Sequence, residues 1–277
     1  MERFIRTLKM RYVKILSYSG KGGTGKTLTA VNTALRFAKR GFKVGLLDID
    51  LEMNSVSRSM GYVGKEVERL KNKRKLKPVT HKTHPNLKMF SLSLMPFLSE
   101  DTEASIIWGG EYQRQYIFQL LYSVDWGKLD VMVIDCPAGI SDSIIALTNI
   151  FKKVDYGIIT GLNNQTSIDG IVKAIKTLNE NNIEIDGVIS NQDYYTCPHC
   201  NKKSYPLGKG AVKQLCKKMK LNYAGGVPLL ETIYKGMETG EPYVDADAYD
   251  AIYYKIIGSN KNLHKLARKN LHVWKEE

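Results

Sequence analysis

The chain has 277 residues, of which 43% are apolar, and it carries a formal net charge of +13. This length and composition suffice for one sizeable hydrophobic core. No apolar run approaches the roughly 20 residues of a transmembrane helix, and residues 1–11 are too short and too charged for a secretory signal. Four cysteines, two of them spaced Cys-x-x-Cys, favour a reducing compartment and a metal site over disulfides, so we expect a cytoplasmic protein.

The positive charge gathers in residues 65–88 and 261–275. Such stretches can bind nucleic acid or anionic lipid, although a solvated surface is the commoner explanation. The first stretch also lacks the interleaved aromatic residues of a base-stacking surface. We therefore expect neither nucleic acid nor a membrane as partner, and we interpret residues 62–88 as a basic surface insertion.

A phosphate-binding loop follows the first predicted strand. Residues 13–17 predict a buried strand and residues 28–40 an amphipathic helix, and the segment between them fits G-x-x-x-x-G-K-[ST]. Glycines let successive backbone N–H groups point at phosphate oxygens, and the following helix adds its positive N-terminal end. The candidate nucleotide-binding residues are Gly20, Lys21, Gly22, Gly23, Thr24, Gly25, Lys26 and Thr27.

Two lysines in this loop have different expected roles. Lys26 is expected to reach the β- and γ-phosphates, and the Thr27 hydroxyl to face Mg²⁺. The second lysine, Lys21, makes the pattern K-G-G-x-G-K-T, which resembles the "deviant" loop of the MinD/ParA/ArsA-like ATPases. In those proteins the extra lysine typically crosses a dimer interface to the partner's nucleotide.

Strands and helices alternate along the rest of the chain. Residues 43–47, 87–91, 131–134, 157–160 and 187–190 predict short buried strands, and residues 111–124 and 167–180 predict helices. This alternation is typical of an α/β fold with a mostly parallel, twisted sheet and helices on both faces. We expect residues 1–277 to form a single P-loop ATPase domain.

The active site of such a sheet forms at the carboxyl ends of its strands. Asp135 ends the strand at 131–134 and is expected to hold Mg²⁺ through water. Asp48 and Asp50 follow the strand at 43–47 and alternate along it, so one supports the metal while the other orients the attacking water. We assign the metal to Asp48 and the water to Asp50. Gly139 is a candidate N–H donor to the γ-phosphate, and Asn191 is a candidate reader of adenine.

A second motif, Cys197-Pro198-His199-Cys200, predicts a metal loop at residues 192–208. One such pair offers two thiolates, whereas closed zinc or iron–sulfur sites usually have four protein ligands. Cys216 falls on an apolar helical stripe and Cys136 lies beside the nucleotide site, so both are expected to be packing residues. A second copy of the chain is then the best source of the missing ligands. Zinc stays open, because it needs the same four ligands or the recruitment of Cys216.

Several ordered motifs together resemble the Mrp/ApbC-type iron–sulfur cluster carrier ATPases, from about Val13 to Val244. The matching segments, beyond the phosphate loop, are Leu46–Asp50 with Ser55, Ile107–Gly110, Val124–Asp130, Gly187–Cys200 and Gly226–Leu229. The chain departs from the family at Met53-Asn54, Ala138 and Leu162–Asn164, all expected near the nucleotide or a switch segment.

The resemblance implies an ATPase homodimer with one bridging [4Fe–4S] cluster, held by Cys197 and Cys200 of each subunit and passed to apo-proteins. It implies ATP and Mg²⁺ as cofactors, the nucleotide roles given above, and a place for Pro228 near the base.

Two other function classes stay open. A ParA/MinD-like positioning ATPase would use DNA or a membrane, and Leu263, Leu266, Ala267 and Trp274 share one helical face that could lie on anionic lipid. A metal-insertion ATPase would carry zinc or nickel at the Cys-x-x-Cys motif.

Overall fold

A mostly parallel sheet organises the molecule. The computed structural model describes residues 12–50, 55–62, 75–91, 94, 117–118, 121–139, 142–151, 153–242 and 247–269. Within these residues eight strands form one sheet in the order β10-β7-β6-β1-β5-β2-β4-β3. The strands are β1 (Val13–Tyr18), β2 (Val44–Asp48), β3 (Val79–Thr80), β4 (Leu87–Phe90), β5 (Val131–Asp135), β6 (Tyr156–Gly161), β7 (Glu184–Ser190) and β10 (Tyr223–Gly226).

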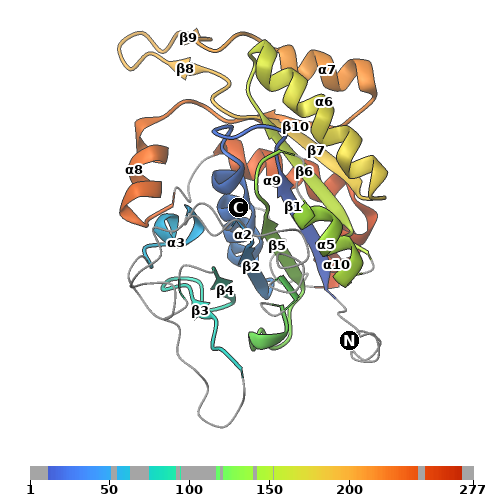
Figure 1. Cartoon of the computed structure of the whole chain (residues 1–277). Helices are drawn as coiled ribbons and strands as arrows, with labels where there is room; N and C mark the ends of the chain where they lie inside the picture. Colours follow the sequence, from blue (N-terminus) through green and yellow to red (C-terminus); the bar gives the residue numbers. More distant parts are fainter. Residues whose placement is uncertain are drawn as a thin grey trace, which may run out of the picture.

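Helices cover both faces of this sheet (Figure 1). Helices α5 and α6 lie in front of it in that view, and α2 and α9 lie behind it and pack against each other. The described helices are α2 (Lys26–Lys39), α3 (Ser55–Ser59), α5 (Asp142–Phe151), α6 (Gln165–Glu180), α7 (Ala211–Met219), α8 (Glu231–Thr239), α9 (Asp247–Ser259) and α10 (Lys261–Lys269). The predicted α/β class, with a mostly parallel sheet covered on both faces, is confirmed.

The strand register brings the catalytic candidates together. All the neighbouring strands pair in parallel except β3, which is antiparallel to β4. Asp135 of β5 pairs with Ser17 of β1 on one side and with Asp48 of β2 on the other. Because β1, β2 and β5 are buried along almost their whole length, their apolar runs are as continuous as a sheet covered on both faces requires.

The structure corrects the extent of the predicted basic insertion at residues 62–88. Residues 63–74 lie outside the described part of the chain. Residues 79–80 and 87–90, however, are the strands β3 and β4, and the Tyr62 hydroxyl donates to the Thr80 carbonyl at 2.9 Å. The second half of the stretch therefore builds the edge of the sheet. Lys88 alternates with the buried residues Leu87 and Met89, so the predicted strand at 87–91 is confirmed and overlaps the end of the predicted insertion.

The helix proposed to lie on lipid is instead docked on the molecule. Leu263 of α10 is buried, and the neighbouring Asn262 side chain donates to the Tyr156 hydroxyl at 2.7 Å. The Leu266 and Ala267 side chains and all of Trp274 lie outside what the structure describes. Among the described residues, no helix has the length and apolar character needed to cross a membrane.

A buried carboxyl at the far end of the sheet generates a stability prediction. Asp186 of β7 is only 5% exposed, and its Oδ1 accepts a hydrogen bond from Asn260 at 3.1 Å. Burial raises the pKa of Asp186 from 3.8 to about 6. The folded state therefore keeps a proton that the unfolded chain has released, and stability falls as the pH rises from about 4 to about 6.

Asp186→Asn should remove this pH dependence and raise the free energy of unfolding at neutral pH, by at most about 3 kcal/mol. Denaturant unfolding at pH 5 and pH 7 measures both effects. Asp169→Asn, on the exposed surface of α6, is the matched control and should change neither. Equal pH dependence in Asp186→Asn and the wild type would contradict the assignment.

Candidate functional site

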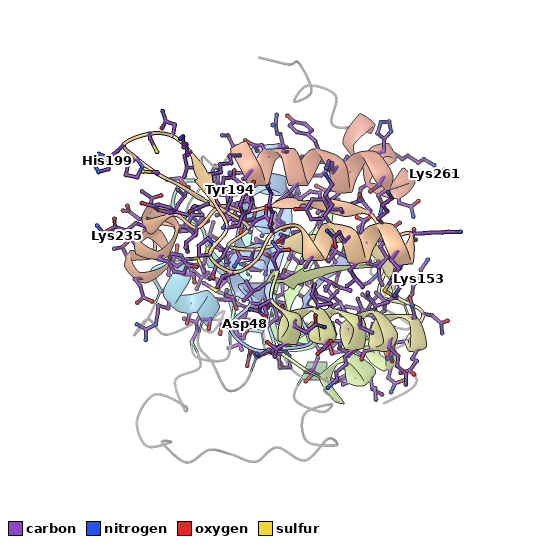
Figure 2. All side chains as sticks on the ribbon, turned by 90° about the horizontal axis from the view of Figure 1, so that it is seen from above. Asp48, Lys153, Tyr194, His199, Lys235 and Lys261 are labelled. Carbon is purple, nitrogen blue, oxygen red and sulfur yellow. The ribbon has the colours of Figure 1, made fainter. Side chains whose placement is uncertain are left out.

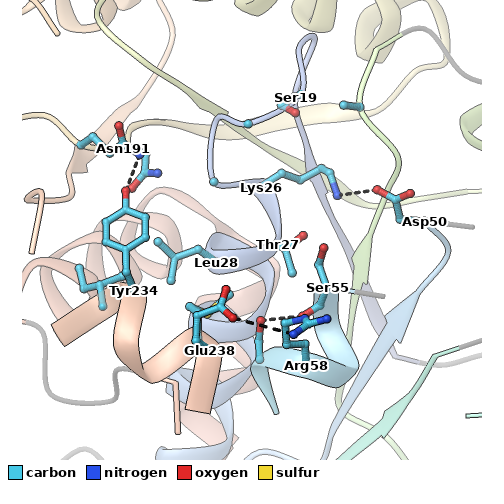
Figure 3. Close-up of a pocket in the computed structure, with 18 of the residues that line it drawn as sticks. Ser19, Lys26, Thr27, Leu28, Asp50, Ser55, Arg58, Asn191, Tyr234 and Glu238 are labelled. Carbon is cyan, nitrogen blue, oxygen red and sulfur yellow. Dashed lines mark hydrogen bonds and ion pairs between the residues drawn. The ribbon is translucent and has the colours of Figure 1, made fainter. Parts of the chain in front are cut away.

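A cavity of about 880 Å³ opens at the carboxyl ends of the central strands (Figure 3). One wall is the predicted phosphate loop with the start of α2, and the opposite wall comes from α3 and α8. Asp50, Pro137, Ala138, Asn191 and Gln192 complete the lining. The cavity therefore lies beside the predicted phosphate loop, at the carboxyl ends of the strands where a nucleotide site is expected.

The phosphate loop has the backbone shape that its glycines predict. Gly23 and Gly25 have φ angles of 76° and 90°, in the left-handed region that favours glycine. A Cβ atom on Gly25 would lie 2.1 Å from the amide nitrogen of Asn191, whereas one on Gly22 would meet nothing within 4 Å. The loop thus lies open on its outer side and is tightly packed where it enters α2.

Asn191 fixes this loop to the end of β7. Its buried side-chain amide donates to the carbonyl oxygen of Thr24 at 3.0 Å. Asn191 also lines the cavity, so its role in reading adenine stays a prediction, and its bond to the loop is an additional structural role. Pro228, which the family resemblance put near the base, is half-buried and does not line the cavity.

A buried ion pair lies beneath the loop. The Lys26 ammonium donates to Asp135 Oδ1 at 2.8 Å and lies 3.5 Å from Asp50 Oδ2, and Thr27 donates to Asp135 Oδ2 at 2.7 Å. Burial disfavours the charged form of Lys26, but Asp135 and Asp50 outweigh it and hold its pKa above the ordinary value. Lys26 therefore stays protonated, as a phosphate ligand must.

The two aspartates after β2 face different surroundings, as their alternation predicts. Asp48 is 1% exposed and accepts hydrogen bonds from the Ser91 hydroxyl at 2.9 Å and the Asp50 backbone N–H at 3.0 Å. Burial and the nearby charge of Asp135 raise the pKa of Asp48 well above its usual range. Asp50 lines the cavity. Asp50 is thus the better placed of the two to meet a bound water.

Two residues predicted to contact a nucleotide, Gly139 and Lys21, do not line the cavity. The backbone N–H of Gly139 donates to the Ser19 carbonyl at 3.0 Å, and its own carbonyl accepts from the Tyr18 hydroxyl. Gly139 does not line the cavity, so a γ-phosphate would have to displace its bond to Ser19. The Lys21 ammonium is exposed and donates to the Thr166 hydroxyl of α6 at 3.1 Å, and Lys21 is not part of the cavity lining.

Sequence reasoning missed the wall formed by α3 and α8. Arg58 of α3 lies 3.9 Å from Glu238 of α8, and Gln192 donates to the Tyr234 hydroxyl (Figure 3). The two helices also touch at their ends, where the backbones of Gly61 and Gly240 are in contact. No local pattern marks residues 231–239 as part of the site, because α8 reaches the cavity by packing against α3, which lies far away in the sequence.

The Cys-x-x-Cys motif lies in a short hairpin. Strands β8 (Tyr195–Thr196) and β9 (Lys203–Ser204) pair antiparallel, and the backbone N–H of Cys197 donates to the Lys202 carbonyl at 3.0 Å. Cys200 is exposed and Cys197 is half-buried. The backbone N–H groups of Cys200 and His199 lower the pKa of the Cys197 thiol. The loop thus favours a thiolate, which is the form that binds metals.

The other two cysteines are packed, as predicted. Cys136 is fully buried, and burial raises the pKa of its thiol. Burial likewise raises the pKa of Cys216 to about 11. Within the described residues no three His, Cys, Asp or Glu side chains form a metal-binding group. Cys197 and Cys200 therefore have no third protein ligand in the described part of their own chain.

The base of this hairpin is fixed to the sheet by one buried side chain. The Asn163 amide nitrogen donates to Asp193 at 2.7 Å and to the Ser190 hydroxyl at 3.0 Å, and its oxygen accepts from the Val212 backbone N–H at 3.0 Å. Asp193 precedes the hairpin and Val212 follows it at the start of α7. Asn163 lies in the segment where the chain departs from the resembled family.

Comparisons with known proteins show which family and which fold this chain is similar to. The family model described as "NUBPL iron-transfer P-loop NTPase" matches residues 11–261. The chain is 31% identical over 234 residues to "Cytosolic Fe-S cluster assembly factor nubp2" of Danio rerio, covering 84% of this chain and 86% of that protein. It is 32% identical over 258 residues to the assembly factor CFD1 of Kluyveromyces lactis, covering 90% of each.

Solved structures show the same fold. A nucleotide-binding protein of Archaeoglobus fulgidus, in complex with ADP, superposes with a TM-score of 0.76 at 24% identity, covering 90% of this chain and 96% of that one. The septum site-determining protein MinD of Pyrococcus horikoshii, complexed with Mg-ADP, gives a TM-score of 0.61 at 19% identity, covering 90% and 96%.

The contrast between Gly25 and Gly22 provides a test of the loop geometry. Gly25→Ala combines a left-handed backbone with a clash against Asn191, so it should lower the free energy of unfolding by about 1–3 kcal/mol. Gly22→Ala, whose Cβ meets open space, should stay within about 0.5 kcal/mol of the wild type. Denaturant unfolding without nucleotide measures both. Equal stability of the two variants would show that Asn191 does not constrain the loop.

Proposed function

The chain belongs to the NUBPL iron-transfer P-loop NTPase family, and we propose that it is an ATP-dependent iron–sulfur cluster carrier. It binds ATP with Mg²⁺, hydrolyses it slowly, holds one [4Fe–4S] cluster between two copies of the chain, and transfers the cluster to apo-proteins in the cytoplasm. The observation that carries this proposal is the presence, in one chain, of a phosphate loop that lines a cavity and a Cys-x-x-Cys pair in a hairpin, with no third metal ligand among the residues that the structure describes.

The residues of the cavity fit a nucleotide with its metal. The open backbone of Gly22 and Gly23 is available to phosphate oxygens, and the protonated Lys26 supplies a positive charge to them. The Thr27 hydroxyl lines the cavity and donates to the buried Asp135, so these two residues would supply the oxygen atoms that Mg²⁺ prefers, with Asp48 beside Asp135 on the neighbouring strand. When bound, Mg²⁺ supplies positive charge that offsets the phosphates during transfer.

Asp50 is the residue that acts on the attacking water. Its carboxylate borders the cavity and lies 3.5 Å from Lys26, so it can accept a hydrogen bond from a water beside the phosphates. No second catalytic residue is evident among the described lining residues, and this supports slow hydrolysis. Positioning and charge compensation then supply most of the rate.

Lys21 acts on the nucleotide of the partner subunit. Its ammonium is exposed, bonds only to the exposed Thr166 among the described residues, and stays outside its own cavity. A lysine on a phosphate loop that does not face its own phosphates is available to a neighbouring site. This geometry supports a homodimer in which each loop completes the site of the other copy.

The cluster is the cargo of the protein, and its ligands are Cys197 and Cys200. Each chain offers two suitable thiols, the cluster needs four, and Cys136 and Cys216 are packed in the interior. A two-fold axis near the hairpin would bring two such pairs together. Because this bridge joins two subunits, it opens whenever the subunits separate, and nucleotide binding through Lys21 can control that opening.

The two loop lysines should have separable effects. Lys26→Ala should abolish ATP binding in equilibrium titrations, because it removes the buried positive charge beneath the loop. Lys21→Ala should keep ATP binding within a few-fold and lose at least about tenfold in hydrolysis, since its target is the other subunit. Mixed dimers with one Lys21→Ala chain then lose turnover in the unmutated subunit. Loss confined to the mutated subunit would contradict the action in trans.

The proposed function is tested by a count of iron. Anaerobically reconstituted protein should contain close to four irons per dimer and be brown, and Cys197→Ala or Cys200→Ala should abolish them. Cys136→Ala and Cys216→Ala are the matched controls and should retain them. Four irons per monomer would refute the bridging arrangement, and a colourless protein with zinc at the same cysteines would make the chain a zinc carrier.

A further inference from the structure

The region that follows the cysteine motif is strongly and uniformly basic. Between Asp193 and Glu231 the sequence contains seven lysines and no aspartate, glutamate or arginine. These residues thus contribute +7 of the net charge of +13. The seven lysines are Lys202, Lys203, Lys209, Lys213, Lys217, Lys218 and Lys220, and all of them are exposed.

None of these lysines has an acidic partner within the described part of the chain, where the ion pairs involve other residues. Lys203 lies over the Tyr194 ring at 3.8 Å and Lys209 over the Tyr205 ring at 4.8 Å. Figure 1 shows the hairpin and α7 along the same edge of the molecule. The charge is therefore concentrated on one side and is not neutralised there.

Two of the seven lysines belong to the cargo site. Lys202 and Lys203 lie two and three residues after Cys200, so in the proposed carrier the negative charge of the cysteine thiolates beside them offsets their charge. The remaining five, Lys209, Lys213, Lys217, Lys218 and Lys220, lie on and around α7, and we call them the α7 face. The apolar stripe of this helix is buried through Val212 and Cys216, so its lysines point away from the core.

We propose that the α7 face is the docking surface for an acidic region of the apo-protein that receives the cluster. This inference rests on the proposed function, because it assigns the surface beside the cysteines to the recipient of their cargo. Charge complementarity of this kind speeds encounter and selects partners without requiring tight binding, which suits a transient transfer.

The chemistry of the face favours a protein over nucleic acid. Met219 at the end of α7 is 39% exposed and Tyr195 of the preceding hairpin is 40% exposed, and such side chains are enriched in protein interfaces. Arginine, which makes the bidentate contacts common in nucleic-acid recognition, is absent from the segment. A second copy of the chain would present the same positive charge, so it does not suit this face.

A matched pair of charge-reversal variants tests the proposal. The first carries Lys213→Glu, Lys217→Glu and Lys218→Glu on the α7 face. The control carries Lys153→Glu, Lys261→Glu and Lys265→Glu, which changes the net charge equally. Figure 2 places Lys153 and Lys261 at the opposite end of the molecule from His199 in the cysteine motif. Both variants should bind ATP as the wild type does.

The probe is a [4Fe–4S] ferredoxin of net negative charge in its apo form. We expect the wild type without cluster to bind it at about 50 mM salt and to lose at least about tenfold in affinity at about 300 mM. The α7-face variant should bind at least about tenfold more weakly at low salt and transfer its cluster correspondingly more slowly. The control variant should stay within about twofold of the wild type for both measurements.

Three results would overturn the proposal. These are wild-type binding and transfer by the α7-face variant, equal losses in the two variants, or no binding of the acidic probe by the wild type. Selective loss of binding to duplex RNA or DNA with unchanged ferredoxin binding would assign the face to nucleic acid. Ferredoxin binding is measured without cluster. A wild-type protein that holds no iron would therefore refute the carrier function, while the binding measurement would still test the α7 face.

Discussion

The buried ion pair between Lys26 and Asp135 is the interaction on which the nucleotide site depends. It joins the first turn of α2 to the end of β5, and Asp135 in turn pairs in register with Asp48 and Ser17 on the neighbouring strands. Removing Lys26 would leave the Asp135 carboxylate buried beside the Thr27 hydroxyl without an opposite charge at hydrogen-bond distance, and an uncompensated buried charge costs far more than the pair contributes. Burial alone would lower the pKa of Lys26, and the charges of Asp135 and Asp50 more than offset that effect.

Two asparagines connect the nucleotide site to the cysteine hairpin. Asn191 joins the phosphate loop to the end of β7, and Asn163 joins the end of β6 to both sides of the hairpin base. Ser190 and Asp193, on either side of Asn191, both bond to Asn163. These hydrogen bonds form a continuous connection between the phosphate loop and the segment that carries the cysteines. This gives the proposed coupling between nucleotide and cargo a physical route.

The fold was predictable wherever one segment carried its own signal. Strands buried on both faces appear as continuous apolar runs, so residues 131–134 and 157–160 were assigned correctly, and the glycine pattern located the phosphate loop. Helices α8 and α9 were not predicted. Helix α8 has few apolar residues. Helix α9 packs against both the sheet and α10, so its apolar residues are not confined to one face as in an amphipathic helix. The strand predicted at residues 87–91 was assigned correctly, whereas the two-residue edge strand β3 is too short to give a pattern of its own.

The candidate site divides in the same way. Lys26, Asp50 and the cysteine motif follow from local patterns, because each lies at a strand end or in a short spaced motif. The roles of Ser91 beside Asp48 and of Asn163 beneath the hairpin depend on contacts between residues 27 to 49 positions apart, which no local pattern encodes. The same holds for Tyr234 on the far wall of the cavity.

The exposed hairpin also has a consequence for the redox chemistry of the protein. Its two cysteines are solvent-accessible, they are separated by two residues, and backbone N–H groups favour the thiolate of Cys197. A thiolate is the form that oxidants attack, and a neighbouring thiol allows the oxidised sulfur to close a disulfide. In the proposed carrier, cargo binding and oxidation would therefore compete for the same two sulfur atoms. A hairpin oxidised by oxygen would bind no metal until a reductant restored its thiols, so the supply of reductant would set how much of the protein could carry cargo.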